Sequence, residues 1–131
     1  MVELLWDAAD RGTARTSFGT LAVGVPGGHD PRELLEAAVA GCMMQALLTA
    51  AAAARIPILG YVSCAKFDER STGIPCVRIH GCVVSPGTVS EAELTRVTDE
   101  ARRSSTVARL LGDRLEVDWD LRVLVGAAED K

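Results

Sequence analysis

The chain has 131 residues, of which 48% are hydrophobic, and its formal net charge is −4. This length predicts one domain, residues 1–131, with a core of its own. The acidic balance, with basic residues scattered singly apart from Arg102 and Arg103, argues against a nucleic-acid partner, because such proteins gather Lys and Arg into a dominant patch.

The N-terminal segment predicts a cytoplasmic protein that begins with short strands. Its first residues, MVELLWDAAD, lack the basic start and apolar core of a signal peptide, so we expect reduced cysteines. VELLW and TLAVGV are typical of strands. We interpret the polar segment between them, DRGTARTSFG, as a hairpin turn or a mobile loop. VPGGHDP, which follows, predicts a loop because of its Gly and Pro content.

A long helix is predicted over residues 31–54. Asp30 as N-cap, Pro31 at the first helical position and Glu33 as the closing residue of a capping box are typical of a helix start. The central part, EAAVAGCMMQALL, is apolar almost all the way round, which indicates burial in a protein core or in a bilayer. The acidic Glu36 and the many alanines disfavour a membrane helix.

Five further elements are predicted in the rest of the chain. ILGYVSCAKFDE and PCVRIHGCVVS indicate an antiparallel hairpin. Ser90 and Glu93 form the capping box of a second helix that ends near Ser104. STVARLLG predicts a short third helix, with Ser104 or Ser105 as N-cap and Gly112 as its stop. The alternation in LEVDWDLRV predicts a half-buried strand.

This order of elements predicts an α+β fold: an antiparallel sheet with a long central buried helix. A helix that is apolar on all sides needs cover on all sides, and the sheet of one small chain supplies only part of it. The simplest remaining cover is a second copy of the chain. We therefore expect a homodimer with this helix near its centre.

The cysteines suggest neither a metal nor a cofactor. They form no CxxC pair and no Cys/His cluster typical of zinc sites; they are Cys42, Cys64, Cys76 and Cys82. The period of a strand places one set of residues from CVRIHGCVV on a single face, namely Cys76, Arg78, His80 and Cys82. A metal there would need a further ligand from elsewhere in the chain. The alternative, a half-exposed sheet face, is the one we adopt.

The sequence resembles the OsmC/Ohr family of osmotically inducible and organic hydroperoxide resistance proteins over residues 30–123. The resemblance lies in DPRELLEAAVAGC, the strand pair and second helix that follow, and SSTVARLL. The short N-terminal strands and the Arg-Glu order after Pro31 are most similar to the YhfA branch. The resemblance implies an intertwined homodimer in which a mid-helix cysteine attacks the O–O bond of an organic hydroperoxide and a second cysteine resolves the sulfenic acid. The first position is Cys42 and the second matches Ser105.

The sequence departs from the family pattern around this cysteine. Ser105 cannot form a disulfide, and its hydroxyl has a structural role as a helix cap besides the alternative of a catalytic serine. Typical members carry a Glu ten residues before the peroxidatic cysteine, where this chain has Arg32, and Glu33 faces the opposite side of the helix from that cysteine. The activating arginine of typical members comes from the N-terminal region, where Arg11 and Arg15 are the candidates.

The reactivity of Cys42 depends on whether a nearby group stabilises its thiolate form. A thiol attacks as thiolate, and apolar surroundings oppose that form. Cys42 lies about three turns into its helix, beyond the first turn where the helix dipole acts strongly. Gln45 and Thr49 are the local polar residues on its face, and Met43 and Met44 are expected in the core or in a dimer interface. A cation from elsewhere would have to activate the thiol.

Two functions remain open. In the first, the protein is a one-cysteine thiol peroxidase: Cys42 reduces an organic hydroperoxide, an external thiol reduces the sulfenic acid, and Cys64 or another cysteine is a possible substitute resolver. In the second, the protein is a diverged, non-peroxidatic dimer that binds a small apolar or thiol-containing ligand, with Cys42 as a buried small residue.

Overall fold

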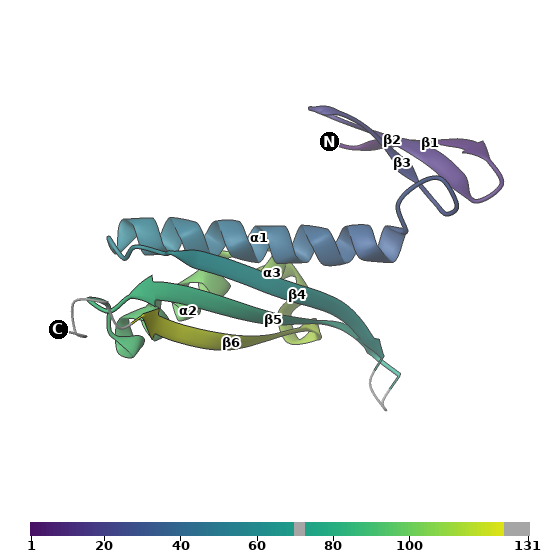
Figure 1. Cartoon of the computed structure of the whole chain (residues 1–131). Coiled ribbons are helices and arrows are strands. Elements are labelled where there is room, and N and C mark those ends of the chain that lie inside the picture. Colours follow the sequence, from purple (N-terminus) through teal and green to yellow (C-terminus); the bar gives the residue numbers. More distant parts are fainter. Residues whose placement is uncertain (70–72, 125–131) are drawn as a thin grey trace. The chain divides into compact units, whose positions relative to one another are not determined.

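The computed structural model describes residues 1–69 and 73–124 (Figure 1). The chain divides into two compact units, Met1–Ala37 and Ala38–Lys131, and each is described by itself. The expectation of a single domain stays a prediction.

The first unit contains a three-stranded antiparallel sheet in the order β1-β2-β3. Its strands are β1 (Glu3–Ala8), β2 (Arg11–Thr16) and β3 (Gly19–Val23). The interpretation of residues 10–19 as a turn or mobile loop was wrong, because most of this segment is strand β2. Its polar residues gave no apolar alternation, since Ala14 is the one side chain of β2 that is buried. The strand is held instead by backbone pairing on both sides.

The long helix α1 spans Pro31–Ala53, and its predicted start is confirmed. The Asp30 carboxylate accepts a hydrogen bond from the Arg32 backbone N–H at 3.1 Å, as an N-cap does. One stripe of the helix is buried: Val39, Met43, Leu47, Ala50 and Ala51. The neighbouring stripe includes Met44 and Leu48, which are 38% and 42% exposed. Within one chain the helix is therefore buried on one side only.

The second unit contains a three-stranded sheet in the order β4-β5-β6. Its strands are β4 (Gly60–Glu69), β5 (Pro75–Pro86) and β6 (Leu115–Leu124). The predicted hairpin is confirmed, because β4 and β5 pair antiparallel. The last strand differs from the expected antiparallel arrangement, since β6 runs parallel to β5. The helices between these two strands carry the chain back across the sheet, and such a crossover is what a parallel pair requires.

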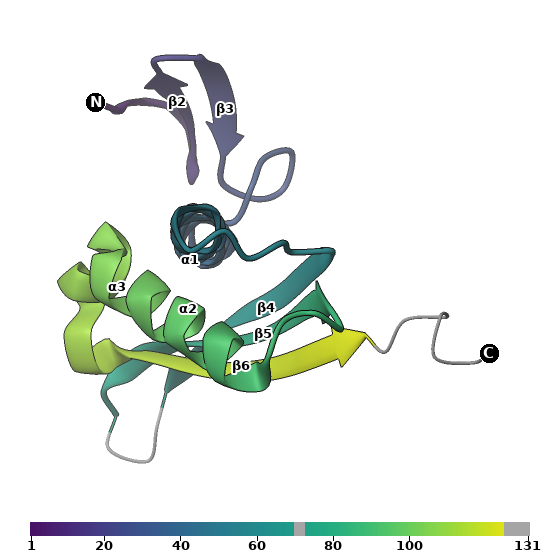
Figure 2. The ribbon, with the colours of Figure 1, turned by 90° about the vertical axis from the view of Figure 1, so that its left-hand side faces the viewer.

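Helices α2 (Glu91–Ser104) and α3 (Thr106–Leu111), followed by the short 3₁₀ helix η1 (Gly112–Arg114), form this crossover. The predicted capping box of α2 is confirmed: Ser90 Oγ accepts from the Glu93 N–H, and the Glu93 carboxylate accepts from the Ser90 N–H, both at 3.1 Å. Helices α1 and α2 lie on the same face of the β4-β5-β6 sheet (Figure 2).

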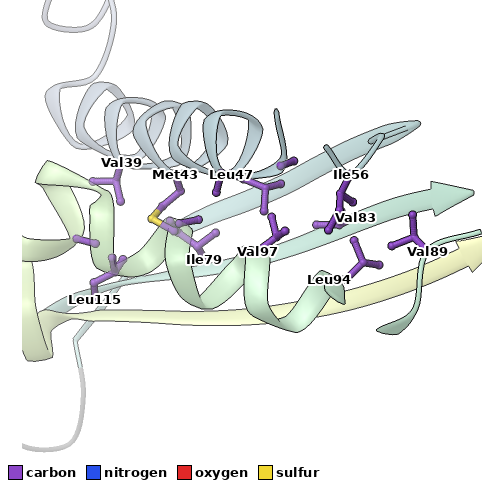
Figure 3. Packing of buried hydrophobic residues seen from close by; sticks show 14 of the residues in the cluster. Val39, Met43, Leu47, Ile56, Ile79, Val83, Val89, Leu94, Val97 and Leu115 are labelled. Atoms are coloured by element: carbon purple, nitrogen blue, oxygen red, sulfur yellow. The ribbon is translucent and has the colours of Figure 1, made fainter. Parts of the chain in front are cut away.

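The core of the second unit fills the space between the helices and the sheet (Figure 3). Met43 and Leu47 of α1, Ile79 of β5 and Leu94 of α2 have no exposed surface. Among the described residues, α1 is the one helix long and apolar enough to cross a membrane. Its buried stripe in this core is consistent with the central helix of a globular fold.

Candidate functional site

Cys42 lies on α1 at the border of the core. The next residue, Met43, is fully buried, whereas Cys42 itself keeps part of its surface exposed. The other thiols differ in access, because Cys76 is 4% exposed, Cys82 is partly exposed and Cys64 is fully on the surface. Cys42 is therefore less enclosed than the core-filling residue of the second functional hypothesis.

A groove between α1 and α2 begins further along the face that carries Cys42. The groove has a volume of about 650 Å³, and Thr49, Ala50, Arg96 and Val97 are among its lining residues. Thr49 follows Cys42 by seven residues, which places the two on the same side of the helix about 10 Å apart along its axis. The lining combines apolar side chains such as Ala50 and Val97 with the charged side chain of Arg96, so its chemistry suits a small, mainly apolar ligand.

Ser105 is the junction between α2 and α3. Its side chain is 3% exposed, and its Oγ accepts a hydrogen bond from the Ala108 N–H at 3.2 Å. Its own backbone N–H donates to the Ala101 carbonyl and so closes α2. The helix-cap interpretation is confirmed, and the hydroxyl needs no catalytic role to explain its presence. Its assignment to catalysis stays a prediction.

The arginines considered as activators of Cys42 belong to the first unit. The Arg15 guanidinium is 3.8 Å from the Glu3 carboxylate. Arg11 begins β2 and lines a shallow depression together with Asp7 and Gly27. Arg32 lies exposed in the first turn of α1. Since Cys42 belongs to the second unit, its activation by any of these residues stays a prediction.

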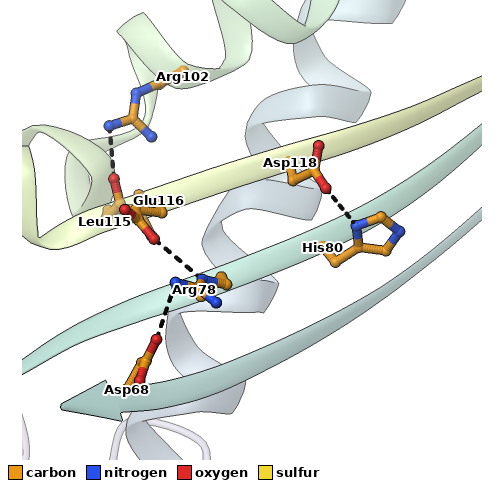
Figure 4. Close-up of polar contacts among 7 residues, drawn as sticks. All are labelled: Asp68, Arg78, His80, Arg102, Leu115, Glu116 and Asp118. Carbon is orange, nitrogen blue, oxygen red and sulfur yellow. Dashed lines mark hydrogen bonds and ion pairs between the residues drawn. The ribbon is translucent and has the colours of Figure 1, made fainter. Parts of the chain in front are cut away.

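The outer face of the β4-β5-β6 sheet, which faces away from the helices, carries a network of polar side chains (Figure 4). Arg78 bridges Asp68 at 3.0 Å and Glu116 at 3.1 Å. His80 Nδ1 lies 3.0 Å from Asp118 Oδ2. The strand period had predicted the shared face of Arg78 and His80 but not their partners on the neighbouring strands. Within residues 1–69 and 73–124, no cluster of three or more His, Cys, Asp or Glu side chains is placed to hold a metal ion.

Tyr61 is the one tyrosine of the chain and was not predicted as a site residue. Its hydroxyl oxygen is buried without a well-formed hydrogen bond among the described residues, and its ring centroid is 6.3 Å from that of Trp119. Burial raises the pKa of Tyr61 above 10.0, and the nearby Ser63 side chain lowers it by a smaller amount. The phenol is a neutral, largely apolar part of the inner sheet face.

Comparisons with known proteins agree on the fold. A family model of OsmC-like proteins matches residues 24–120. The structure is similar to an OsmC-like protein from Mycoplasma pneumoniae, with a TM-score of 0.76, 14% identity, and coverage of 95% of this chain and 96% of that one. It is also similar to a hypothetical protein from Aquifex aeolicus VF5, with a TM-score of 0.75, 19% identity, and coverage of 95% and 97%.

A third similar structure is the organic hydroperoxide resistance protein OhrB of Bacillus subtilis, with a TM-score of 0.66, 15% identity, and coverage of 92% of this chain and 97% of that one. No curated protein matches the sequence. Identities this low show a shared fold, and the likeness to the YhfA branch stays a prediction. The family match covers well over half of the chain, so the protein belongs to the OsmC-like family.

Proposed function

We propose that the protein is a one-cysteine, thiol-dependent peroxidase that reduces organic hydroperoxides through Cys42. The observation that carries this proposal is the partial exposure of Cys42 on the long helix of an OsmC-like fold. A reagent thiol must meet its substrate, and a buried cysteine such as Cys76, which is 4% exposed, does not. The fold is also that of proteins named for organic hydroperoxide resistance, including the one from Bacillus subtilis.

The chemistry needs one protein thiol and two equivalents of an external thiol. The Cys42 thiolate attacks the hydroperoxide, an S–O bond forms, the O–O bond breaks, and the departing alkoxide takes up a proton to become an alcohol. An external thiol then displaces water from the sulfenic acid and leaves a mixed disulfide. A second external thiol attacks that disulfide and restores the Cys42 thiol. Ser105, as a helix cap, supplies no sulfur to this cycle.

The working form that we propose is a homodimer. The first unit leaves large apolar side chains uncovered in its sheet and in the turn between β2 and β3: Leu4 is 64%, Trp6 77% and Phe18 102% exposed. A small sheet needs an apolar face packed against something to be stable. In the second unit, α1 also exposes Met44 and Leu48, which are 38% and 42% exposed. A second copy would cover both surfaces and could bring a cation to Cys42.

Hydroperoxide consumption tests the peroxidase. Purified protein is mixed with cumene hydroperoxide and one of several thiol reductants, and the wild type is compared with Cys42→Ser. Cys82→Ser is the matched control, because Cys82 is a partly exposed cysteine outside the proposed cycle. We expect turnover in the wild type and in Cys82→Ser, and background rates in Cys42→Ser.

Equal background rates in all three proteins would contradict the peroxidase. Ligand binding in the groove between α1 and α2, measured with small apolar thiols and thioethers, would then favour the non-peroxidatic dimer. Light scattering tests the dimer separately. A monomer that stays folded at micromolar concentration would contradict the burial of α1 by a second copy.

A further inference from the structure

A cysteine, a histidine and an aspartate lie in one row across the outer face of the β4-β5-β6 sheet. Cys64 of β4 is the direct cross-strand partner of His80, and His80 is the register partner of Asp118 on β6. The neighbours of His80 along β5, Ile79 and Gly81, are buried, so His80 points to the opposite face. Cys64 is exposed, and the His80 and Asp118 side chains are 59% and 75% exposed.

Asp118 fixes the orientation of the histidine ring. The carboxylate Oδ2 lies 3.0 Å from His80 Nδ1 and accepts a hydrogen bond from it (Figure 4). In the neutral ring this leaves Nε2 as the proton acceptor, on the far side of the ring from Asp118. Directly opposed residues of an antiparallel pair have Cβ atoms about 4.5–5.5 Å apart, so the Cys64 thiol is within reach of the imidazole by rotation of its side chain.

We propose that Cys64, His80 and Asp118 form a second thiol site, at which Cys64 exchanges with a low-molecular-weight disulfide. His80 Nε2 takes the proton of the Cys64 thiol, the thiolate attacks one sulfur of the disulfide, a new S–S bond forms and the old one breaks. The proton then passes from His80 to the departing thiolate. The products are a mixed disulfide on Cys64 and one free thiol, so electrons and atoms balance without another oxidant.

The mixed disulfide persists because neither other thiol on this face is well placed to resolve it. Cys76 is buried and lies four residues from His80 along β5. Cys82 is the register partner of Val62, one step along from the Cys64–His80 pair, and so lies diagonal to Cys64. Diagonal neighbours are about 7–8 Å apart, and a disulfide needs Cα atoms closer than about 7 Å. Removal of the adduct therefore requires an external thiol. The site acts as a reversible thiolation point that is separate from Cys42.

The charges around the row favour a neutral disulfide as the probe. The titratable side chains that share this face with the row come from all three strands; they are Lys66, Asp68, Cys76, Arg78, Cys82, Glu116, Asp120 and Arg122. Positive and negative groups balance among them, and Arg78 is paired with both Asp68 and Glu116. An open face of this kind selects neither anionic nor cationic disulfides, so 2-hydroxyethyl disulfide is suitable.

The test measures the rate of adduct formation on the full chain. Protein is mixed with 2-hydroxyethyl disulfide at neutral pH, and peptide mass spectrometry follows each cysteine over time. We expect an adduct at Cys64 that forms faster than the adduct on Cys82 and faster than exchange with the free thiol of glutathione under the same conditions; any adduct on Cys42 is counted separately. His80→Ala should slow the Cys64 rate about tenfold, less than for an enclosed acid–base pair because the site is exposed.

Asp118 acts as a positioning residue for the His80 ring. Two variants of Asp118 separate the loss of this ring orientation from a general loss of folding. Asp118→Asn should slow the Cys64 rate about threefold, whereas Asp118→Glu should keep most of it, since a carboxylate still accepts the Nδ1 hydrogen bond. The cumene hydroperoxide activity of Cys42 serves as an independent control in His80→Ala and Asp118→Asn. Equal rates at Cys64 and Cys82, or an unchanged Cys64 rate in His80→Ala, would overturn the proposal.

Discussion

The Trp119 ring lies across the backbone of Gly81. The two residues are register partners on β6 and β5. A Cβ atom on Gly81 would lie 2.7 Å from Cζ3 and 2.9 Å from Cε3 of the indole ring. Both distances are too short for carbon atoms in contact, so this glycine provides the space that the largest side chain of β6 occupies.

Gly81→Ala should therefore destabilise the protein. The indole ring has to move within a packed layer, which costs about 1–3 kcal/mol in the free energy of unfolding. Chemical denaturation measures this loss. Gly60→Ala is the control, because the nearest atom to its added Cβ is the Val84 Cβ at 3.8 Å, an ordinary contact. Equal losses in both variants would contradict the fit between Gly81 and Trp119.

Ser105→Ala should lower the stability of the α2–α3 junction. The substitution removes the oxygen that accepts the Ala108 N–H and leaves that buried amide without its partner, at a cost of about 1 kcal/mol. The midpoint of urea unfolding is the measurement. Ser104→Ala is matched to it: Ser104 is the neighbouring serine, but its exposed hydroxyl makes only a 3.4 Å contact with the Ala101 carbonyl. A loss confined to Ser104→Ala would contradict the cap.

Ser105→Cys tests the correspondence between Ser105 and the resolving position of the family. With a thiol at this position, we expect hydroperoxide treatment to give a disulfide between residues 42 and 105 in place of a lasting sulfenic acid on Cys42. Non-reducing peptide mapping detects this bond. Ser104→Cys provides the neighbouring thiol as a control. A sulfenic acid that accumulates as fully as in the wild type would show that residue 105 is not within reach of Cys42.

The capping box of α2 predicts a loss of stability in acid. The Ser90 backbone N–H, with the Ser90 hydroxyl second, holds the pKa of Glu93 below its ordinary value of 4.5. A carboxylate with a lowered pKa stabilises the folded state fully above that ordinary value, and the contribution is lost as the pH falls through the lower folded value. Glu93→Gln should flatten this part of the stability profile. Glu91→Gln, in the same turn but outside the box, should keep the wild-type profile.

Local signals in the sequence predicted where helices begin better than they predicted which strands pair with one another. Asp30 and the Ser90–Glu93 pair marked the starts of α1 and α2 because a cap acts within one turn of its own helix. The parallel pairing of β6 was not predicted, since it depends on how α2 and α3 return the chain to the sheet. Strand β2 was missed because a polar strand held by backbone hydrogen bonds has no apolar period.

The candidate sites also divide into those marked by a local sequence segment and those formed by distant parts of the chain. Cys42 and Ser105 could be identified within short segments, and the cap at Ser105 followed from its own helix. The position of Cys64 beside His80, and of Asp118 on its other side, depends on the register of three strands from distant parts of the sequence. The alternation of β5 placed His80 on a face but left open which residues stand next to it.

Tyr61 provides a direct probe of packing on the inner face of the sheet. Because it is the one tyrosine in the chain, tyrosinate absorbance reports its ionisation alone. Burial raises its pKa, so we expect titration above 10.0 in the folded protein and near 10.0 in the denatured chain. Ser63→Ala removes the group that lowers the pKa and should move the folded titration to still higher pH.

The neutral phenol is favoured in the folded state, so stability should fall as the pH rises from 10.0 to the folded pKa, because the unfolded chain ionises first. A folded titration at or below 10.0 would mean that the hydroxyl is solvated and that Tyr61 does not pack against Trp119.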